Sequence, residues 1–340
     1  MKTKKTYIIA EAGVNHNGNV DTAFLLIEAA KKCGADCVKF QTFKTEEIVS
    51  AHSPKANYQL KVTNPNENQF DMLKKLELNM DDFSRLKNHC EKIGIDFLST
   101  PYSFEDADLL ERIGVNGYKV ASGQIAEIPF LRYLSEKRKK MIVSTGMATF
   151  TEVQKAVETI RNHGNPELII LQCTTEYPSQ PQDTNLLAMV QMKHELHVRT
   201  GYSCHVPGNL ACYGAVALGA EIIEKHFTLD KSSPGPDHSS SLEPPEFVDL
   251  VKNIRIMESC LGSGVKIPTE SELKNKYGMR RSLVARHFLK AGTVITLKDL
   301  AFKRPMNGLS PNELDQVIGK TINKDLQQDQ PFTKDLLSEF

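Results

Sequence analysis

The sequence contains no tryptophan and no surplus of charge of either sign. Its 340 residues include 42 Lys and Arg against 42 Asp and Glu, so the formal net charge is zero. A chain with this balance has no overall positive field to attract nucleic acid or an anionic membrane surface. The composition therefore argues against a general polyanion binder, and the expected partners are small molecules or further copies of the chain.

Long hydrophobic runs and paired cysteines are also missing. No run approaches the roughly 20 apolar residues that a helix needs to cross a bilayer, and no apolar signal segment follows the opening MKTKK. The 7 cysteines are an odd number and include no CxxC pair, so they do not form the pattern of a disulfide framework. We therefore predict a cytoplasmic protein with reduced thiols and no membrane span.

The sequence instead contains a repeated alternation of strand and helix patterns. Segments such as 20–34, 104–114 and 149–164 have helical spacing of apolar residues. This alternation predicts parallel strands joined by right-handed crossovers, and eight units over about 260 residues favour a (β/α)8 TIM barrel over an open doubly wound sheet. The eight strand-like runs are 7–15, 37–44, 96–102, 117–124, 141–146, 168–178, 197–205 and 221–228.

The composition changes near residue 264. After the apolar helical segment 246–263, the sequence VKIPTESELKNKYGM is polar and helix-breaking. We therefore predict a barrel over 1–263, a linker over 264–277 and a small second domain over 278–340. The short β-like runs and turn signals of the last segment predict a mixed, mostly β fold, too small to bury a large core of its own.

Acids, bases and histidines gather at the ends of the last two strands. In a barrel of this kind the carboxyl ends of the strands converge on the face that carries the chemistry. Period-two alternation puts Glu224 and His226 on one face with Lys225 on the other, and it pairs Ser203 with His205. Two imidazoles from adjacent strands suit a divalent metal with open positions for substrate and water. The alternative is that each histidine is a hydrogen-bonded core residue.

Lysines and hydroxyl groups follow the earlier strands. Lys39 shares the inward face of its strand with Gln41, and Lys119 shares that of the fourth strand. Inward lysines are costly unless they meet an anion, so they predict a phosphorylated or carboxylated substrate. The alternative places both lysines at the outer surface and the serines at helix caps. Hydroxyl and N–H donors suited to phosphate lie at Ser99-Thr100, Ser122-Gly123 and Ser144-Thr145-Gly146.

The first strand closes in EAGVNHNG, which contains Glu11, Asn15 and His16. These side chains either contact a polyhydroxy substrate or cap the helix that starts near Asn19.

Taken in order, the motifs resemble those of one family. They are AEAGVNHNG, VKFQTF, LSTP, YKVASG, VSTGMAT, CTTEYP, GYSCH, ALGAEIIEKHFTLDK, PGPDH, SLEP and KRPMNG, and they extend from about residue 6 to about residue 335. Together they resemble the sialic acid synthase family, bacterial enzymes of the N-acetylneuraminate synthase type.

The resemblance implies a (β/α)8 barrel followed by a small antifreeze-protein-like domain, in a homodimer where that domain covers the partner's active site. Members condense phosphoenolpyruvate with a 2-acetamido mannose-type aldehyde, release phosphate and form a nine-carbon 2-keto sugar acid. The implied cofactor is a divalent metal, typically Mn²⁺, with Mg²⁺ or Co²⁺ as alternatives. The leading expectation is an N-acetylneuraminate synthase. The alternative is an N,N'-diacetyllegionaminate synthase, which uses 2,4-diacetamido-2,4,6-trideoxymannose.

The resemblance also implies roles for individual residues. His205 and His226 resemble the metal ligands, and the catalytic set is Glu11, Glu224 and His226. The positions that resemble the phosphoenolpyruvate site are Lys39, Thr100, Lys119, Ser122, Ser144, Thr175 and Ser203. The positions that resemble the sugar site are Glu11, Gln41, Gln124, Tyr177, Asp237 and Arg304, the last reaching into the neighbouring subunit.

Three positions depart from the family pattern. Gln124 stands where Glu is common, which removes a charge; Cys204 replaces the Asp of GYSDH; and Met306 replaces the first Gly of RPGNG. Alternation predicts that Cys204 faces away from His205. A carbohydrate-binding protein with an inactive barrel is the non-enzyme alternative, and the intact lysines and histidines argue against it.

Overall fold

The computed structural model describes residues 5–64, 66–164 and 167–338. The chain forms two compact units, Met1–Ser263 and Gly264–Phe340. Unit 1 contains the whole strand and helix alternation predicted from the sequence, and unit 2 is the smaller.

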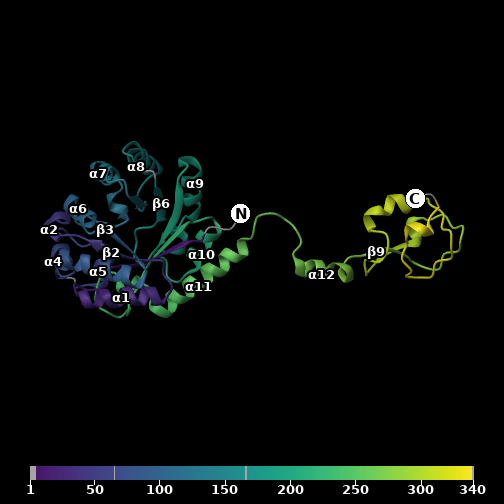
Figure 1. The fold of residues 1–340 in the computed structure, drawn as a ribbon, viewed down its shortest axis with the longest axis horizontal. Helices are drawn as coiled ribbons and strands as arrows, with labels where there is room; N and C mark the ends of the chain where they lie inside the picture. The colour runs from purple at the N-terminus through teal and green to yellow at the C-terminus, as the bar shows by residue number, and fades with distance from the viewer. Residues whose placement is uncertain (1–4, 65, 165–166, 339–340) are drawn as a thin grey trace. The chain divides into compact units, whose positions relative to one another are not determined.

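Eight parallel strands form the centre of unit 1 (Figure 1). They pair in the order β3-β2-β1-β8-β7-β6-β5-β4, and β3 and β4, the two ends of this order, also contact each other. The sheet therefore curls into a nearly closed barrel, which confirms the predicted fold. The strands are β1 (Tyr7–Gly13), β2 (Cys37–Thr42), β3 (Asp96–Pro101), β4 (Gly117–Val120), β5 (Lys140–Ser144), β6 (Leu168–Cys173), β7 (Arg199–Cys204) and β8 (Ile222–His226).

Helices connect the strands and lie outside them (Figure 1). Their starts follow local capping chemistry: the Asn19 side chain accepts from Asp21 N and Thr22 N, and Thr149 forms a capping box with Glu152. The connecting helices are α1 (Val20–Lys32), α5 (Met80–Ile93), α6 (Phe104–Arg112), α7 (Ile128–Glu136), α8 (Phe150–Asn162), α9 (Leu186–Leu196), α10 (Leu210–Ala217) and α11 (Pro244–Leu261), with 3-10 turns η1 (Ser122–Gln124), η2 (Pro181–Asp183) and η3 (His238–Ser240).

Several strands end earlier than the sequence pattern predicted. The predicted runs 117–124 and 168–178 end at Val120 and Cys173. The predicted runs included the polar residues that follow these points, but the backbone there turns away from the sheet, as η1 shows after β4. Gln124 and Tyr177 therefore lie on loops at the carboxyl end of the barrel rather than on strands.

The connection from β2 to α5 carries three extra short helices. We call residues 43–79 the β2–α5 insert, which contains α2 (Thr45–Ile48), α3 (Asn57–Val62) and α4 (Gln69–Lys74). Lys55 is buried in it and donates to Thr63 Oγ1, Asn64 O and Glu67 Oε1 at 2.8, 2.7 and 3.1 Å. These hydrogen bonds satisfy the buried ammonium group and join the start of α3 to the loop that follows it.

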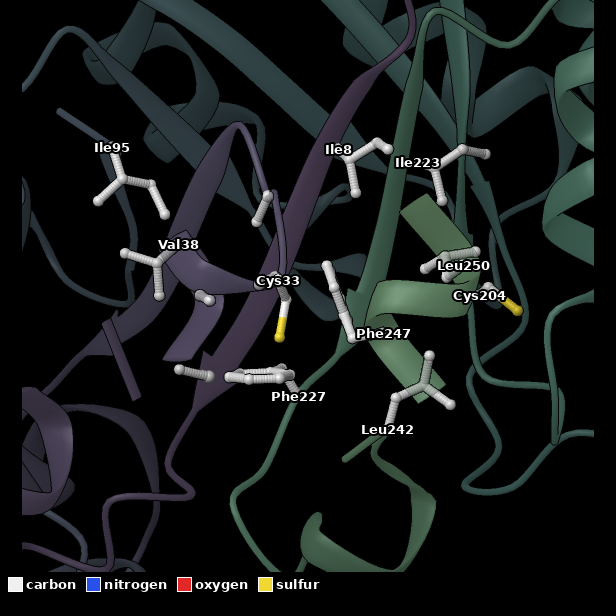
Figure 2. Packing of buried hydrophobic residues seen from close by; sticks show 14 of the residues in the cluster. Ile8, Cys33, Val38, Ile95, Cys204, Ile223, Phe227, Leu242, Phe247 and Leu250 are labelled. Carbon is white, nitrogen blue, oxygen red and sulfur yellow. The ribbon is translucent and has the colours of Figure 1, made fainter. Parts of the chain in front are cut away.

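Two apolar layers surround the strands. Inward-facing residues such as Ile9, Ile169 and Ile222 form a floor inside the barrel. Outward-facing residues pack against the helices, as Figure 2 shows for Ile223 of β8 near Leu250 of α11. Alternate positions of each strand thus point to different layers. The polar residues that follow the inward apolar layer toward the carboxyl ends of the strands point into the mouth of the barrel.

Unit 2 has its own apolar core, with Leu283, Ile295 and Phe332 among its buried members. Its antiparallel pair is β9 (Ser282–Ala285) with β10 (Leu300–Lys303), accompanied by α13 (Leu314–Val317) and the turns η4 (Leu297–Asp299), η5 (Pro311–Glu313) and η6 (Lys334–Leu336). The segment 264–277, predicted to be a helix-breaking linker, instead contains most of α12 (Glu270–Met279), which Thr269 and Glu272 cap. Across the residues described, we find no helix with the length and apolar character required to span a bilayer.

Candidate active site

A cavity of about 490 Å³ opens at the carboxyl ends of the barrel strands. Every barrel residue to which the family resemblance assigns a role lines it, so the structure brings together side chains from seven strands and from loops that follow the strands. These residues are Glu11, Lys39, Gln41, Thr100, Lys119, Ser122, Gln124, Ser144, Thr175, Tyr177, Ser203, His205, Glu224, His226 and Asp237.

Two lysines and two glutamates form the floor of the cavity. The ammonium of Lys39 lies 2.8 Å from Glu11 Oε1 and 3.8 Å from Glu224 Oε1, and that of Lys119 lies 3.7 Å from Glu224 Oε1. All four side chains are buried. The alternative that the lysines reach solvent is therefore wrong, because both point into the barrel.

The two carboxyl groups have opposite pKa shifts. Burial raises the pKa of Glu11, outweighing the attraction of Lys39. Burial also acts on Glu224, but Lys119 and Lys39 together outweigh it and lower the pKa of that carboxyl. Two nearby carboxyl groups with pKa values shifted in opposite directions can divide their roles, because the one with the raised pKa can hold a proton while the other stays ionised.

Hydroxyl groups surround the lysines. Lys119 Nζ donates to Ser144 Oγ at 2.7 Å, Ser203 Oγ donates to Glu224 Oε1 at 3.0 Å, and Lys39 Nζ lies 3.4 Å from Thr100 Oγ1. Beyond them, Gly146 N donates to Ser122 Oγ at 3.0 Å. A Cβ at Gly146 would lie only 2.1 Å from Thr175 Oγ1, so only glycine fits between these hydroxyls.

The two histidines lie side by side, with ring centroids 5.4 Å apart. His205 Nδ1 lies 2.6 Å from the carbonyl oxygen of Thr174, so Nδ1 carries the proton and Nε2 keeps its lone pair. The ring of Tyr177 packs on His205 at 4.0 Å, and Tyr58 of α3 packs on Tyr177 at 4.8 Å. Burial lowers the pKa of both His205 and His226, so both imidazoles are neutral near pH 7.

These histidines fit a metal centre with open positions. Both are neutral, as a metal ligand must be, and His226 Nδ1 is buried without a hydrogen-bond partner among the residues that the structure describes. Over the described parts of the chain, no group of three or more His, Cys, Asp and Glu side chains is arranged around a metal position. Two protein ligands would leave the remaining positions to substrate and water.

Several polar atoms at the cavity have no partner within the described structure. They are Glu11 Oε2, Glu224 Oε2, His226 Nδ1 and Thr175 Oγ1. Buried polar atoms are nearly always hydrogen-bonded to protein or water, so a group of four at one cavity marks a polar surface suited to water or a polar ligand.

The outward-facing neighbours of the site residues are structural. Lys225 donates to Cys204 Sγ at 3.2 Å and to Gly208 O at 3.1 Å, and it also reaches Val206 O. Cys204 belongs to the core between strands and helices (Figure 2), which confirms that it faces away from His205. Asn15 is likewise structural: its amide donates to Phe227 O and Ser241 Oγ, both at 2.9 Å, and Asn19 caps the helix.

Gln124 uses both ends of its amide to hold the protein backbone. Its Oε1 accepts from Ala121 N at 3.2 Å and its Nε2 donates to Pro101 O at 3.1 Å. The side chain is buried at the cavity wall, between the ends of β3 and β4. Glutamine is therefore the residue type that this pair of backbone groups requires.

We expect Gln124→Glu to reduce the free energy of unfolding at pH 7 by about 1 to 3 kcal/mol, because a carboxylate oxygen would face the Pro101 carbonyl in place of a donor. A protonated carboxyl can donate, so the deficit should shrink as the pH falls toward 5. Urea unfolding of both proteins at the two pH values measures this. Equal stability at pH 7 would contradict the assigned contacts.

The sequence did not identify part of the lining. Val14, Phe43, Ile48, Leu73 and Tyr102 also line the cavity, three of them from the β2–α5 insert. The only sequence signal was the unusual length of chain between the second and third strands. Arg304 belongs to unit 2, following β10, and its predicted role in a neighbouring subunit stays a prediction.

The chain is similar to known sugar acid synthases. The model of the NeuB family matches residues 26–266, and that of the SAF domain, the antifreeze-like type, matches 280–338. The N,N'-diacetyllegionaminic acid synthase of Campylobacter jejuni is 44% identical over 329 residues, covering 96% of this chain and 98% of that one. The enzyme of the same description from Legionella pneumophila is 42% identical over 324 residues, covering 94% and 91%.

Solved structures give the same result. The crystal structure of the N-acetylneuraminic acid (sialic acid) synthetase of Leptospira borgpetersenii, in complex with citrate, superposes with a TM-score of 0.72. It is 33% identical and covers 80% of this chain and 90% of its own.

Proposed function

This chain belongs to the NeuB family, and from that premise we propose that it condenses phosphoenolpyruvate with a 2-acetamido mannose-type aldehyde to give a nine-carbon 2-keto sugar acid and phosphate. The observation that carries the proposal is the cavity floor, where two buried lysines lie among hydroxyl groups and unpartnered carboxylate and imidazole atoms. A small substrate with a phosphate and a carboxylate, and a polar acceptor beside it, supplies what those groups lack.

The residues take distinct parts in the proposed reaction. Lys39 and Lys119, with the hydroxyls of Thr100, Ser144 and Ser203, hold the phosphate and carboxylate of phosphoenolpyruvate. Fixed cations and hydroxyls of this kind also stabilise charge that develops as the carbon–carbon bond forms. The remaining members of the proposed phosphoenolpyruvate set are Ser122 and Thr175.

The acceptor aldehyde would lie between the histidines and Glu11. His205 and His226 would hold the divalent cation, which supplies a Lewis acid for the aldehyde oxygen when bound. C3 of phosphoenolpyruvate then bonds to the aldehyde carbon, water adds at C2, and phosphate leaves. Glu11, whose pKa burial raises, is suited to hold a proton near that oxygen, and the ionised Glu224 is suited to accept one from the water.

The acceptor favoured among the two expected sugars is 2,4-diacetamido-2,4,6-trideoxymannose. The relatives with the highest identity reported above are described as N,N'-diacetyllegionaminic acid synthases, and the N-acetylneuraminic acid synthetase is more distant. We therefore propose an N,N'-diacetyllegionaminate synthase, with N-acetylneuraminate synthase, the leading expectation from the sequence, as the second candidate.

Phosphate release tests the reaction. With Mn²⁺, phosphoenolpyruvate and either sugar, the purified protein should release phosphate in proportion to the keto acid formed. Excess chelator and His226→Ala should each reduce the rate by at least roughly 10³-fold, since a Lewis acid contributes several kcal/mol to such a step. Phosphate release that persists at full rate with excess chelator would disprove the metal assignment.

We further propose a homodimer in which Arg304 of unit 2 reaches the acceptor site of the neighbouring subunit, as the family resemblance implies. Reduced affinity for the sugar in Arg304→Ala, with the affinity for phosphoenolpyruvate unchanged, would support this arrangement.

A further inference from the structure

One side of the cavity is apolar, in contrast to its charged floor. We call Val14, Phe43, Ile48, Leu73 and Tyr102 the apolar wall. With Leu76 they form one packed cluster, separate from the barrel core, and all five wall residues line the cavity. The rings of Phe43 and Tyr102 pack edge to face at 6.1 Å, so the wall is a defined surface and not a scatter of side chains.

The apolar wall faces the cavity with unburied surface. Phe43 and Val14 are buried, but Ile48 and Leu73 are only half-buried, and Val49 beside them is also half-buried and lines the cavity. Apolar side chains that stay partly exposed at the edge of a charged site gain stability when a ligand covers them. A hydroxyl group of a sugar would find no hydrogen-bond partner on these side chains.

A chain of contacts places the wall relative to the reacting groups. Tyr102 OH lies 3.4 Å from Gln41 Oε1, Gln41 Nε2 donates to Glu11 Oε1 at 3.1 Å, and Glu11 in turn pairs with Lys39. Starting from the proposed phosphoenolpyruvate site, the side chains therefore follow in the order Lys39, Glu11, Gln41 and then the apolar wall. An acceptor with its aldehyde near Glu11 would direct its distal carbons toward the apolar wall.

Two amide side chains border the wall. Gln59 of α3 and Gln69 of α4 line the cavity, and Gln69 Nε2 donates to Gln59 Oε1 at 3.2 Å. Gln59 Oε1 also accepts from Ala56 N at 3.0 Å, which fixes its orientation. An acetamido group combines a methyl with an amide, so it matches a surface where apolar side chains adjoin amides.

From these observations we infer that the apolar wall is the subsite for the distal carbons of the acceptor, and that Ile48 and Leu73 select a 6-deoxy sugar bearing an acetamido group at carbon 4. This inference rests on the proposed function and adds the residues that decide which acceptor is used. The methyl at carbon 6 and the acetamido methyl would cover Ile48 and Leu73. N-acetylmannosamine would place hydroxyl groups there instead.

The test compares kcat/KM for 2,4-diacetamido-2,4,6-trideoxymannose and for N-acetylmannosamine in three variants. Methyl contacts in an apolar pocket are worth roughly 10- to 200-fold in discrimination. We therefore expect Ile48→Asn and Leu73→Gln each to reduce the ratio of the two kcat/KM values by at least about tenfold, with KM for phosphoenolpyruvate unchanged. Leu60→Asn is the matched control, because Leu60 is an exposed apolar residue of α3 that is not part of the cavity lining.

The outcomes separate this inference from the proposed function. A wild-type protein that releases phosphate with neither sugar overturns both. A wild-type protein that is active but equally active with the two sugars, or two folded variants that keep the wild-type ratio, overturns the inference alone. If one asparagine or glutamine variant fails to fold, as judged by thermal unfolding, Ile48→Thr gives the same comparison, because it keeps the branch at Cβ and replaces the ethyl arm of isoleucine with a smaller hydroxyl.

Discussion

Lys119→Met is expected to reduce kcat/KM for phosphoenolpyruvate by on the order of 10³-fold. The side chain is buried, donates to Ser144 Oγ at 2.7 Å, and lies 3.7 Å from Glu224. In the proposed complex this ammonium pairs with the anionic substrate, and removing one partner of such a buried charge pair across a binding interface costs about 4 kcal/mol, where each 1.36 kcal/mol is roughly a tenfold change in rate. Methionine keeps most of the volume of lysine, so the change isolates the lost charge.

Steady-state phosphate release at varied phosphoenolpyruvate measures this effect. Lys137→Met is the control, since Lys137 lies at the end of α7 and pairs with Asp108 at 2.6 Å, away from the cavity lining. Both variants should unfold at temperatures close to that of the wild type. An Lys119 variant that stays within threefold of the wild-type kcat/KM would show that this lysine does not hold the substrate.

Asp237→Asn is expected to stabilise the metal-free protein at alkaline pH by roughly 4 kcal/mol. Burial, and then the negative charge of Glu11, raise the pKa of Asp237 from 3.8 to about 7. Because the folded state binds the proton more tightly than the unfolded state, stability is lost as the pH rises from about 4 to about 7 and is constant above that range. Asparagine has no charge to bury, so the variant escapes this loss.

Urea unfolding with a chelator present tests the sign. The stability advantage of Asp237→Asn should be only about 1.5 kcal/mol at pH 5 and reach its full size by pH 8, which follows from 1.36 kcal/mol per unit of pKa difference. An advantage that is equal at both pH values would mean that Asp237 titrates normally in the folded protein.

The alternation of side chains along each strand allowed the sequence to predict which residues point into the site. It correctly assigned Lys39, Glu224 and His226 to the inside of the barrel and Lys225 and Cys204 to the outside. This works because each strand is buried on two different surfaces, so a side chain of the wrong parity would meet the helix layer. The structure places these residues together, whereas their chemical roles rest on the proposals above.

The β2–α5 insert was beyond sequence reasoning for a physical reason. Its helices α2, α3 and α4 have 4, 6 and 6 residues, too short to show a helical repeat. Tertiary contacts fix them, such as Thr45 N donating to Glu77 Oε1 at 2.7 Å. The backbone contacts of Gln124 could not be foreseen for a similar reason, because its two partners come together only when β3 and β4 are adjacent.

The insert also separates the proposed choice of acceptor from the groups proposed for bond formation, because the two lie on different parts of the chain. The hydrogen bonds of Lys55 hold the insert together, and its apolar cluster packs it against Val14 and Tyr102. The lysines proposed to hold the anion lie instead on the barrel strands, and the two histidines lie at strand ends. Under the proposed function, we therefore expect substitutions in the insert to change acceptor preference while the groups proposed for bond formation stay in place. For the protein engineer, this division marks the insert as the segment to randomise first.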